Sequence, residues 1–234
     1  MLSLDDAIAA PITALGGAVA GIRLSGDGAW KIAQAVFPSL PDAPEPRKAL
    51  YGKFVHGDDG LCLPFATGGS YTGEESVELF VHGSPASVRL LMAALREAGA
   101  REAGPGEFTQ RAFMNGRLDL SQAEGVRAAI EAESEVALRA AGRQREGATF
   151  AAIVGLVAPI EKTLADIEAR VDFSEELGEL DIPASRDEIA AVRDDLAKLR
   201  EGARATRLAR DGARIAILGA PNVGKSSLLN ALVR

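Results

Sequence analysis

A phosphate-binding loop near the end of the sequence places the strongest constraint on the fold. Residues 219–226, GAPNVGKS, match the pattern G-x-x-x-x-G-K-[ST] at every fixed position. An apolar run at 215–218 precedes this loop, and residues 227–233 have the composition of a helix. A strand, a glycine-rich loop and a helix N-terminus together form a site for a polyphosphate. Because a doubly wound nucleotide domain needs several parallel strands, the sequence predicts only the beginning of such a domain.

Composition narrows the class of protein. A chain of 234 residues is long enough for more than one domain, and 47% hydrophobic with 25% charged residues is ordinary for soluble proteins. The net charge of −7 argues against a general nucleic-acid coat protein. The single cysteine, Cys62, excludes an internal disulfide and fits a reducing compartment. Because we find neither a basic leader after Met1 nor an apolar stretch of membrane-spanning length, we expect a cytoplasmic protein without a membrane partner.

The sequence up to about residue 118 alternates short strands with helices, which is typical of an α+β domain. Residues 18–24 and 77–82 have the pattern of strands, and the second carries Val77, Leu79 and Val81 on one face. Strands over 50–55 and 61–65 would form a hairpin with its turn at 58–60, DDG. Helices are expected over 30–37 and 85–98.

From residue 121 the apolar period changes to that of helices. Residues 121–124 (SQAE) and 185–188 (SRDE) have the capping-box pattern that begins a helix. Apolar residues recur at steps of three and four over 150–171 and again over 189–199. Pro159 would either kink the first of these helices or begin a new one. The sequence therefore predicts two or three long helices that belong to a bundle.

Two charged residues and two glycine-bearing segments in the first part allow two interpretations each. Arg23 interrupts an apolar strand, and Glu78 lies on the strand face opposite Val77, so each side chain is either solvated or part of a site. Residues 71–75 (YTGEE) and 104–113 (GPGEFTQRAF) fit turns and a helix start, although they look too specific for ordinary turns.

The remaining polar candidates have simpler explanations. Cys62 falls in a predicted strand and is better explained as a small buried apolar residue than as a nucleophile. His56 and His82 lack the spacing of a zinc site with Cys62. A stripe of arginines at helical spacing is either a solvated helix face or a contact with a phosphate backbone; its members are Arg200, Arg204, Arg207, Arg210 and Arg214.

Six segments, taken in order, make the chain similar to the MnmE (TrmE) family of tRNA modification GTPases. They are GIRLSG (21–26), YTGEES (71–76), VELFVHG (77–83), GPGEFTQRAFMNGRLDLSQAE (104–124), VDFSEE (171–176) and GAPNVGKSSLLNAL (219–232). The phosphate-binding loop alone would suit many GTPases. The long segment 104–124, joined to that loop through a helical region, is close to diagnostic of this family.

The resemblance implies three domains. Residues 1–118 would form an α+β domain that binds tetrahydrofolate and makes a homodimer. Residues 119–211 would form the first half of an all-α helical domain, and residues 212–234 the start of a truncated α/β G domain. Since the switch loops and the base-specifying Asn-Lys-x-Asp are not in the sequence, we expect an incomplete copy that is itself inactive towards GTP.

The resemblance also implies a function. With an FAD-dependent MnmG partner, in a heterotetramer, the family adds a folate-derived one-carbon unit and an amine at C5 of the wobble uridine (U34) of certain tRNAs. Hydrolysis of GTP, which depends on K⁺, drives the modification. Which tRNAs are served remains open at this point. The alternatives are an Era-like regulatory GTPase without modification chemistry and a free-standing folate-binding module, which the phosphate-binding loop disfavours.

Site residues carry over by position. Arg23, Glu78 and Arg117 align with positions that contact the folate, either 5-formyl- or methylene-tetrahydrofolate. Ser226 matches the Mg²⁺ ligand and Asn222 the asparagine that helps to hold K⁺, and no catalytic residue is assigned in this chain. The residues expected to bind GTP are Gly219, Asn222, Val223, Gly224, Lys225, Ser226 and Ser227.

Overall fold

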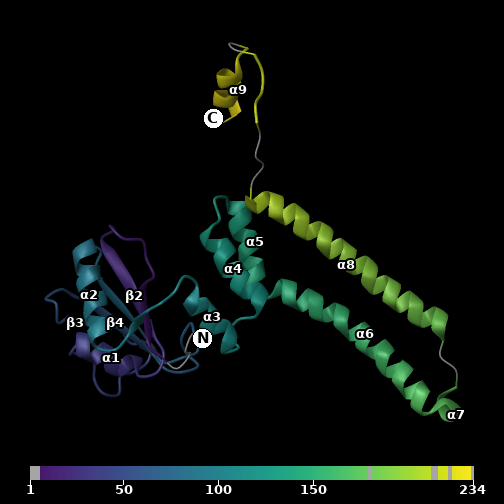
Figure 1. Ribbon diagram of the computed structural model, residues 1–234, viewed down its shortest axis with the longest axis horizontal. Coiled ribbons are helices and arrows are strands. Elements are labelled where there is room, and N and C mark those ends of the chain that lie inside the picture. Colours follow the sequence, from purple (N-terminus) through teal and green to yellow (C-terminus); the bar gives the residue numbers. More distant parts are fainter. Residues whose placement is uncertain (1–5, 179–180, 212–215, 221–222, 233–234) are drawn as a thin grey trace. The chain divides into compact units, whose positions relative to one another are not determined.

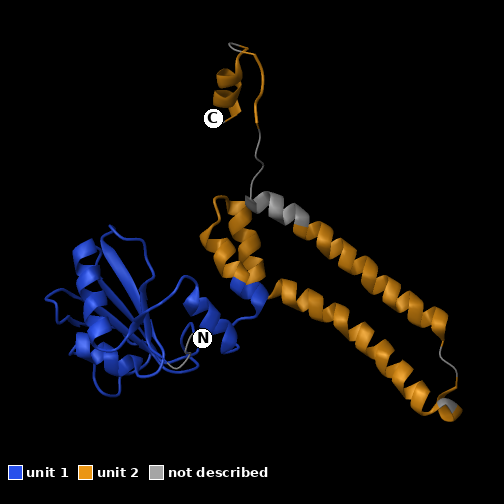
Figure 2. Cartoon of the chain, viewed as in Figure 1, with its two compact units in different colours: residues 1–123 blue, residues 124–234 orange. Residues whose placement is uncertain are grey.

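The chain divides into two compact units, residues 1–123 and 124–234 (Figure 2). The structure, a computed structural model, describes residues 6–178, 181–211, 216–220 and 223–232. The first unit has both strands and helices, whereas the described elements of the second are helices. The predicted α+β fold of the first part and the helical fold of the following part are therefore confirmed.

A six-stranded mixed sheet forms the centre of the first unit. Its strand order is β3-β4-β5-β2-β1-β6, and neighbouring strands are antiparallel except for β1 and β6, which run parallel. The strands are β1 (Ile8–Pro11), β2 (Val19–Ser25), β3 (Leu50–Lys53), β4 (Asp59–Phe65), β5 (Ser76–His82) and β6 (Arg101–Glu102).

The main apolar core lies on one face of this sheet. Alternate residues of β2 and β5 point to this face, and helices α1 (Ala29–Val36) and α2 (Pro85–Glu97) cover it (Figure 1). The predicted face of Val77, Leu79 and Val81 is buried here, as expected. Its main partners are Ala20, Ile22, Leu24, Ala33, Val36, Cys62, Leu91 and Leu95.

The turn of the β3–β4 hairpin lies earlier than predicted. Asp59 and Gly60 are inside β4, and the chain reverses over 54–58, where Gly57 takes a φ of 94°. The prediction assigned the Asp-Gly pair to the turn, but Gly60 instead allows β4 to pack closely against β5. A Cβ at Gly60 would lie 1.9 Å from the carbonyl oxygen of Phe80, so the close approach of β4 and β5 needs a glycine there.

The second unit is built from helices of very different length. Two of them, α6 (Ala148–Asp172) and α8 (Ile182–Asp211), lie side by side (Figure 1). Helix α6 continues through Pro159, whose carbonyl oxygen accepts a hydrogen bond from Thr163 Oγ1 at 3.0 Å. The other helices are α4 (Leu120–Ile130), which begins in the first unit, α5 (Glu135–Arg145), α7 (Ser174–Leu177) and α9 (Lys225–Leu232).

Both predicted capping boxes were misplaced. At the start of α4 the reciprocal pair is Asp119 and Gln122, because Gln122 N donates to Asp119 Oδ1 at 2.8 Å and Asp119 N to Gln122 Oε1 at 2.9 Å. At the start of α8, Asp181 Oδ1 accepts from Ala184 N at 3.0 Å, so the helix begins before residues 185–188. Asp caps a helix as well as Ser does, and in both cases an aspartate stood a few residues ahead of the predicted serine.

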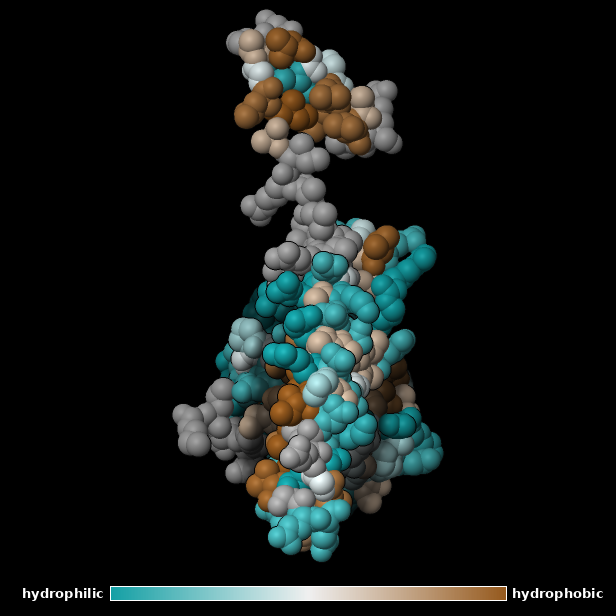
Figure 3. Space-filling model, turned by 90° about the vertical axis from the view of Figure 1, so that its right-hand side faces the viewer, coloured by the Kyte–Doolittle hydropathy of each residue, from teal (hydrophilic) through white to brown (hydrophobic). Residues whose placement is uncertain are grey.

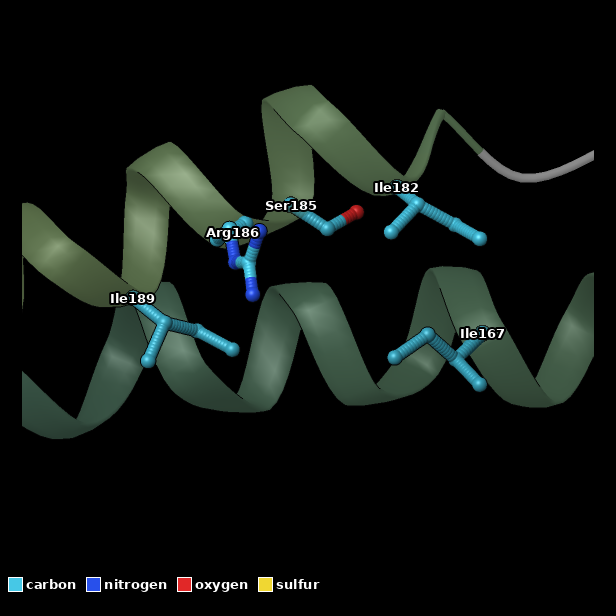
Figure 4. A pocket seen from close by; sticks show the side chains of 5 residues that line it. All are labelled: Ile167, Ile182, Ser185, Arg186 and Ile189. Atoms are coloured by element: carbon cyan, nitrogen blue, oxygen red, sulfur yellow. The ribbon is translucent and has the colours of Figure 1, made fainter.

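Helices α6 and α8 both have the predicted apolar stripes, but the rest of the described structure buries these stripes only in part. Glu188 of α8 joins the helices through Lys162 Nζ and Thr163 Oγ1, each at 2.9 Å. Next to this contact lies an open hollow of about 280 Å³, lined by Ile167, Ile182, Ser185, Arg186 and Ile189 (Figure 4). About half of the surface of Val154, Ile160, Leu164, Ile189 and Leu196 is exposed.

One expectation about membranes has to be corrected. Helix α6 has 25 residues and an 18-residue window of mean hydropathy 1.4, which satisfies the length and composition of a membrane span. One such helix is weak evidence for a membrane. The sequence reading missed it because α6 was treated as one amphipathic stripe.

The strand predicted before the phosphate-binding loop was not found. Residues 216–218 form no strand, and Ile215 lies outside the described residues. A strand exists only through its pairing, and the described part of the second unit offers none to pair with. The predicted helix is present as α9, and apolar side chains gather on the surface of the segment that carries it, among them Leu218, Leu228, Leu229 and Leu232 (Figure 3).

Candidate functional site

Arg23 and Glu78, two of the predicted site residues, face each other on neighbouring strands. They are directly opposite in the register of β2 and β5 and lie on the sheet face away from α1 and α2. Arg23 donates to Glu78 Oε1 from Nη2 at 2.8 Å and from Nε at 3.1 Å. Each side chain is 17% exposed, so the pair is sheltered but reachable from solvent.

Two aromatic rings lie against the guanidinium group of Arg23. Its Cζ is 4.6 Å from the ring centroid of Tyr71 and 5.5 Å from that of Phe108. Tyr71 comes from the loop between β4 and β5, and Phe108 from α3 (Glu107–Met114). A hydrogen bond of 2.9 Å between the Tyr71 hydroxyl and Thr109 Oγ1 joins the loop to the helix.

Arg117, the third predicted folate residue, has a different setting. Its side chain is exposed, and among the described residues it forms no ion pair. Its stem lies against Gly73, where a Cβ would be 2.9 Å from Arg117 Cγ, and Gly73 takes a φ of 83°. The structure therefore brings Arg23 and Glu78 into contact and places Arg117 beside the loop that carries Tyr71.

Residue Thr72 is the centre of the 71–75 segment. Its side chain is fully buried, and its Oγ1 lies 2.6 Å from Ser25 Oγ and accepts from Glu74 N at 3.2 Å. Its carbonyl oxygen accepts from Asn115 Nδ2 at 2.8 Å. The loop is thus fastened to β2 on one side and to the end of α3 on the other.

A group of charges around one buried arginine, which we call the Arg111 cluster, holds the 104–113 segment in place. It consists of Asp6, Glu74, Arg101, Glu107 and Arg111, and the side chain of Arg111 is fully buried. Arg111 pairs with all three carboxylates, while Arg101 pairs with Asp6 and Glu107 at 2.7 Å each. A buried charge needs such partners to offset its lost hydration.

Proton binding by Glu107 reflects this environment. The hydrogen bond from Arg101 is the largest cause that lowers the pKa of Glu107, and the Gly104 N–H and Arg111 add to it against the effect of burial, giving a pKa of about 2. Gly104 N donates to Glu107 Oε2 at 2.7 Å. Sequence reasoning missed the cluster, although the density of charged residues in YTGEE and GPGEFTQRAF was its signal.

The phosphate-binding loop is only partly described. Lys225 Nζ donates to the carbonyl oxygens of Gly219 at 2.9 Å and Ala220 at 2.7 Å, and Gly224 takes a φ of 89°. The lysine thus points back over its own loop, where a polyphosphate would compete with these carbonyls. Ser226 and Ser227 lie in the first turn of α9 and are exposed, Val223 is exposed in the loop, and Asn222 lies outside the described residues.

Other polar candidates have structural roles. Cys62 is buried in β4, and burial raises the pKa of its thiol to about 12, as expected for a residue that acts as a small apolar side chain. Asp58 accepts hydrogen bonds from Ser87 Oγ and from His82 Nδ1, which joins the hairpin turn to β5 and α2. Asp58, Asp59 and His82 place potential ligand atoms within 4.8 Å of one another, and no zinc site was predicted there.

A groove of about 490 Å³ along β1, α2 and β6 does not coincide with the predicted site. Its lining is mainly apolar, and two of its three charged members, Arg96 and Glu102, pair with each other at 3.3 Å. Of the arginine stripe, Arg200 lies in α8, the side chains of Arg204, Arg207 and Arg210 are not described, and Arg214 lies outside the described residues.

Comparisons with known proteins cover nearly all of the chain. Residues 7–117 match the family model described as "GTP-binding protein TrmE N-terminus", and residues 120–227 match "MnmE helical domain". Curated proteins named "tRNA modification GTPase MnmE" are similar to it. That of Thermus thermophilus is 46% identical over 100% of this chain and 55% of its own length, and that of Halorhodospira halophila is 46% identical over 97% and 49%. The chain spans about half the length of the curated relatives it matches.

Proposed function

This chain belongs to the MnmE (TrmE) family, and we propose that its first unit binds a reduced folate that serves as a one-carbon donor. The observation that carries the proposal is the Arg23–Glu78 pair on an open sheet face under two aromatic rings. Both residues fall in the segment matched by the TrmE N-terminus.

The chemistry of the pair suits a folate. The pterin ring of a folate carries amide- and amine-type donors that a carboxylate accepts, and its glutamate tail carries carboxylates that bind cations. Glu78 would therefore face the pterin. The exposed Arg117, beside the same loop, is available for the anionic tail.

We further propose that the chain acts in tRNA modification. In this proposal the one-carbon unit, together with an amine, is added at C5 of the wobble uridine U34 with an FAD-dependent MnmG partner. The donor would be 5-formyl- or methylene-tetrahydrofolate. The name of the relatives, tRNA modification GTPase, supports a role in tRNA modification. A homodimer through the first unit, a heterotetramer with MnmG and a cytoplasmic location complete the proposal.

The second unit would contribute the nucleotide site. Lys225 would exchange its two carbonyl partners for the β- and γ-phosphates of GTP, with the N–H groups at the start of α9 around them. Ser226 would hold Mg²⁺ and Asn222 K⁺, and these cations would neutralise charge that develops on the transferred phosphoryl group.

The two alternatives account for less of the chain. An Era-like regulatory GTPase would use the phosphate-binding loop but has no use for the matched first unit. A free-standing folate module would leave residues 120–227, which match the helical domain, without a role.

Titration calorimetry with 5-formyl-tetrahydrofolate tests the proposal on the 234-residue chain. Glu78→Ala should weaken binding by about 2 kcal/mol, because a charge-assisted hydrogen bond is lost. Glu97→Ala, at an exposed position of α2, is the matched control and should bind as the wild type does. If Glu78→Ala binds with unchanged affinity while circular dichroism confirms its fold, Glu78 is not in the site.

A further inference from the structure

The guanidinium group of Arg23 is fixed on three sides. Glu78 bonds its Nε and Nη2 atoms, and the rings of Tyr71 and Phe108 lie 4.6 and 5.5 Å from its Cζ. A free arginine side chain samples many rotamers, and ordering them costs conformational entropy. Here the contacts within the folded protein already order the side chain, so a ligand does not have to order it on binding.

The bonding pattern leaves one carboxylate oxygen of the pair unused. Both bonds from Arg23 end on Oε1 of Glu78, so within the described part of the chain Oε2 of Glu78 has no partner. The Nε and Nη2 atoms of Arg23 thus orient the carboxylate and leave Oε2 as an acceptor. A ligand edge that carries N–H donors, such as that of a pterin, is complementary to this oxygen.

Hydrogen bonds, as well as packing, hold Tyr71 and its loop in place. Its hydroxyl is hydrogen-bonded to Thr109 Oγ1 and therefore does not occupy the carboxylate of Glu78. The next residue, Thr72, is bonded to Ser25 and Asn115, and Glu74 pairs with the buried Arg111. The ring over Arg23 is thus attached through its loop to β2, to α3 and to the Arg111 cluster.

We propose that Tyr71 is a positioning residue of the folate site, whose ring holds Arg23, and through it the Glu78 carboxylate, so that Oε2 of Glu78 can accept from the donor edge of a bound pterin. Phe108 supports Arg23 from α3 in the same way at a longer distance. The inference rests on the proposed function, because it assigns the pair a ligand with such an edge.

A double-mutant cycle separates positioning from a general structural role. Titration of the full chain with 5-formyl-tetrahydrofolate compares the wild type, Tyr71→Leu, Arg23→Met and the double variant. Tyr71→Leu should weaken binding about tenfold, the size of a cation–π contact in a sheltered site. In the Arg23→Met background the same substitution should change affinity less than about twofold, because the group it positions is gone.

Conservative and control variants complete the design. Tyr71→Phe keeps the ring and should restore binding to within about threefold of the wild type, since one neutral hydrogen bond is lost. Tyr51→Leu removes an exposed ring from β3, which β4 and β5 separate from β2, and should bind as the wild type does. If Tyr71→Leu does not fold, Phe108→Leu takes its place in the cycle, with a smaller effect in the same direction.

A spectroscopic measurement reads the position of Arg23 without a ligand. In a ¹⁵N–¹H spectrum, the Nε–H signal of Arg23 should be shifted by the ring current of Tyr71, keep that shift in Tyr71→Phe and lose it in Tyr71→Leu. Equal losses of affinity for Tyr71→Leu with and without Arg23, or an unshifted signal, would overturn the inference alone. A wild-type chain that binds no folate would overturn the proposed function and the ligand role of Tyr71 with it.

Discussion

The Arg23–Glu78 pair shows how far single residues could be interpreted before the structure was known. From the residues alone, each was either solvated or part of a site, and only the resemblance joined them. The strand register brings them opposite each other, which no local pattern encodes. The partners of Arg111 come from positions 6, 74 and 107, so a charge cluster of this kind depends on tertiary structure that sequence periodicity does not report.

The Arg111 cluster makes the stability of the first unit depend on pH. Glu107 has a pKa of about 2 in the folded chain against an ordinary value of 4.5. Its carboxylate therefore contributes its full stabilisation above about pH 4.5 and loses it as the pH falls towards 2, an effect of at most about 3 kcal/mol. Urea unfolding at a series of pH values, followed by circular dichroism, measures this.

The variant Glu107→Gln isolates that contribution. It should lower the free energy of unfolding at neutral pH and flatten its decline between pH 5 and pH 2, since the titrating group is gone. Glu97→Gln, which removes an exposed carboxylate of α2, should leave the curve unchanged. An identical pH dependence in Glu107→Gln and the wild type would show that the cluster does not set acid stability.

At the scale of elements, periodicity predicted the helices and strands well and their ends less well. β2, β5, α1, α2 and α9 lie where the apolar patterns placed them. The caps of α4 and α8 shifted because several residue types cap a helix and the pattern alone does not choose among them. The strand predicted over 215–218 does not form in its described part. An apolar run can predict a strand, but the strand forms only where a second strand pairs with it.

Uneven burial of the elements predicts uneven hydrogen exchange. Amides of β5 should exchange slowly, because the strand is paired on both sides and its inward face is buried. Amides of α8 over 189–203 should exchange faster, since its apolar residues are about half exposed, and those of α9 fastest of all. Mass spectrometry of the exchanged chain checks this order, and equal protection in the three elements would contradict it.

At the scale of the whole molecule, the two units have unequal support for a function. The first has a buried apolar core. At its candidate folate site it has the Arg23–Glu78 ion pair and a loop that hydrogen bonds hold in place. The second presents half-covered helices and a phosphate-binding loop whose described flank, 216–218, forms no strand. Fold class and family were therefore predictable from the sequence, whereas the contacts among the side chains of the candidate folate site were not.

The nucleotide loop should bind weakly in the 234-residue chain. The N–H groups of such a loop hold phosphates well only when a neighbouring sheet fixes their directions, and Lys225 is bonded to its own loop. Titration calorimetry with a non-hydrolysable GTP analogue should therefore show little or no heat of binding. Low-micromolar affinity would show that the loop is organised without a sheet.

Exchanging the two charges of the candidate site is the sharpest test of whether Arg23 and Glu78 bind the folate. The double variant Arg23→Glu with Glu78→Arg keeps an ion pair between β2 and β5 but moves donor and acceptor to the opposite strands. We expect a thermal midpoint close to that of the wild type and no measurable binding of 5-formyl-tetrahydrofolate in titration calorimetry. A folded double variant that binds the folate as tightly as the wild type would contradict the assignment of Arg23 and Glu78 to the ligand site.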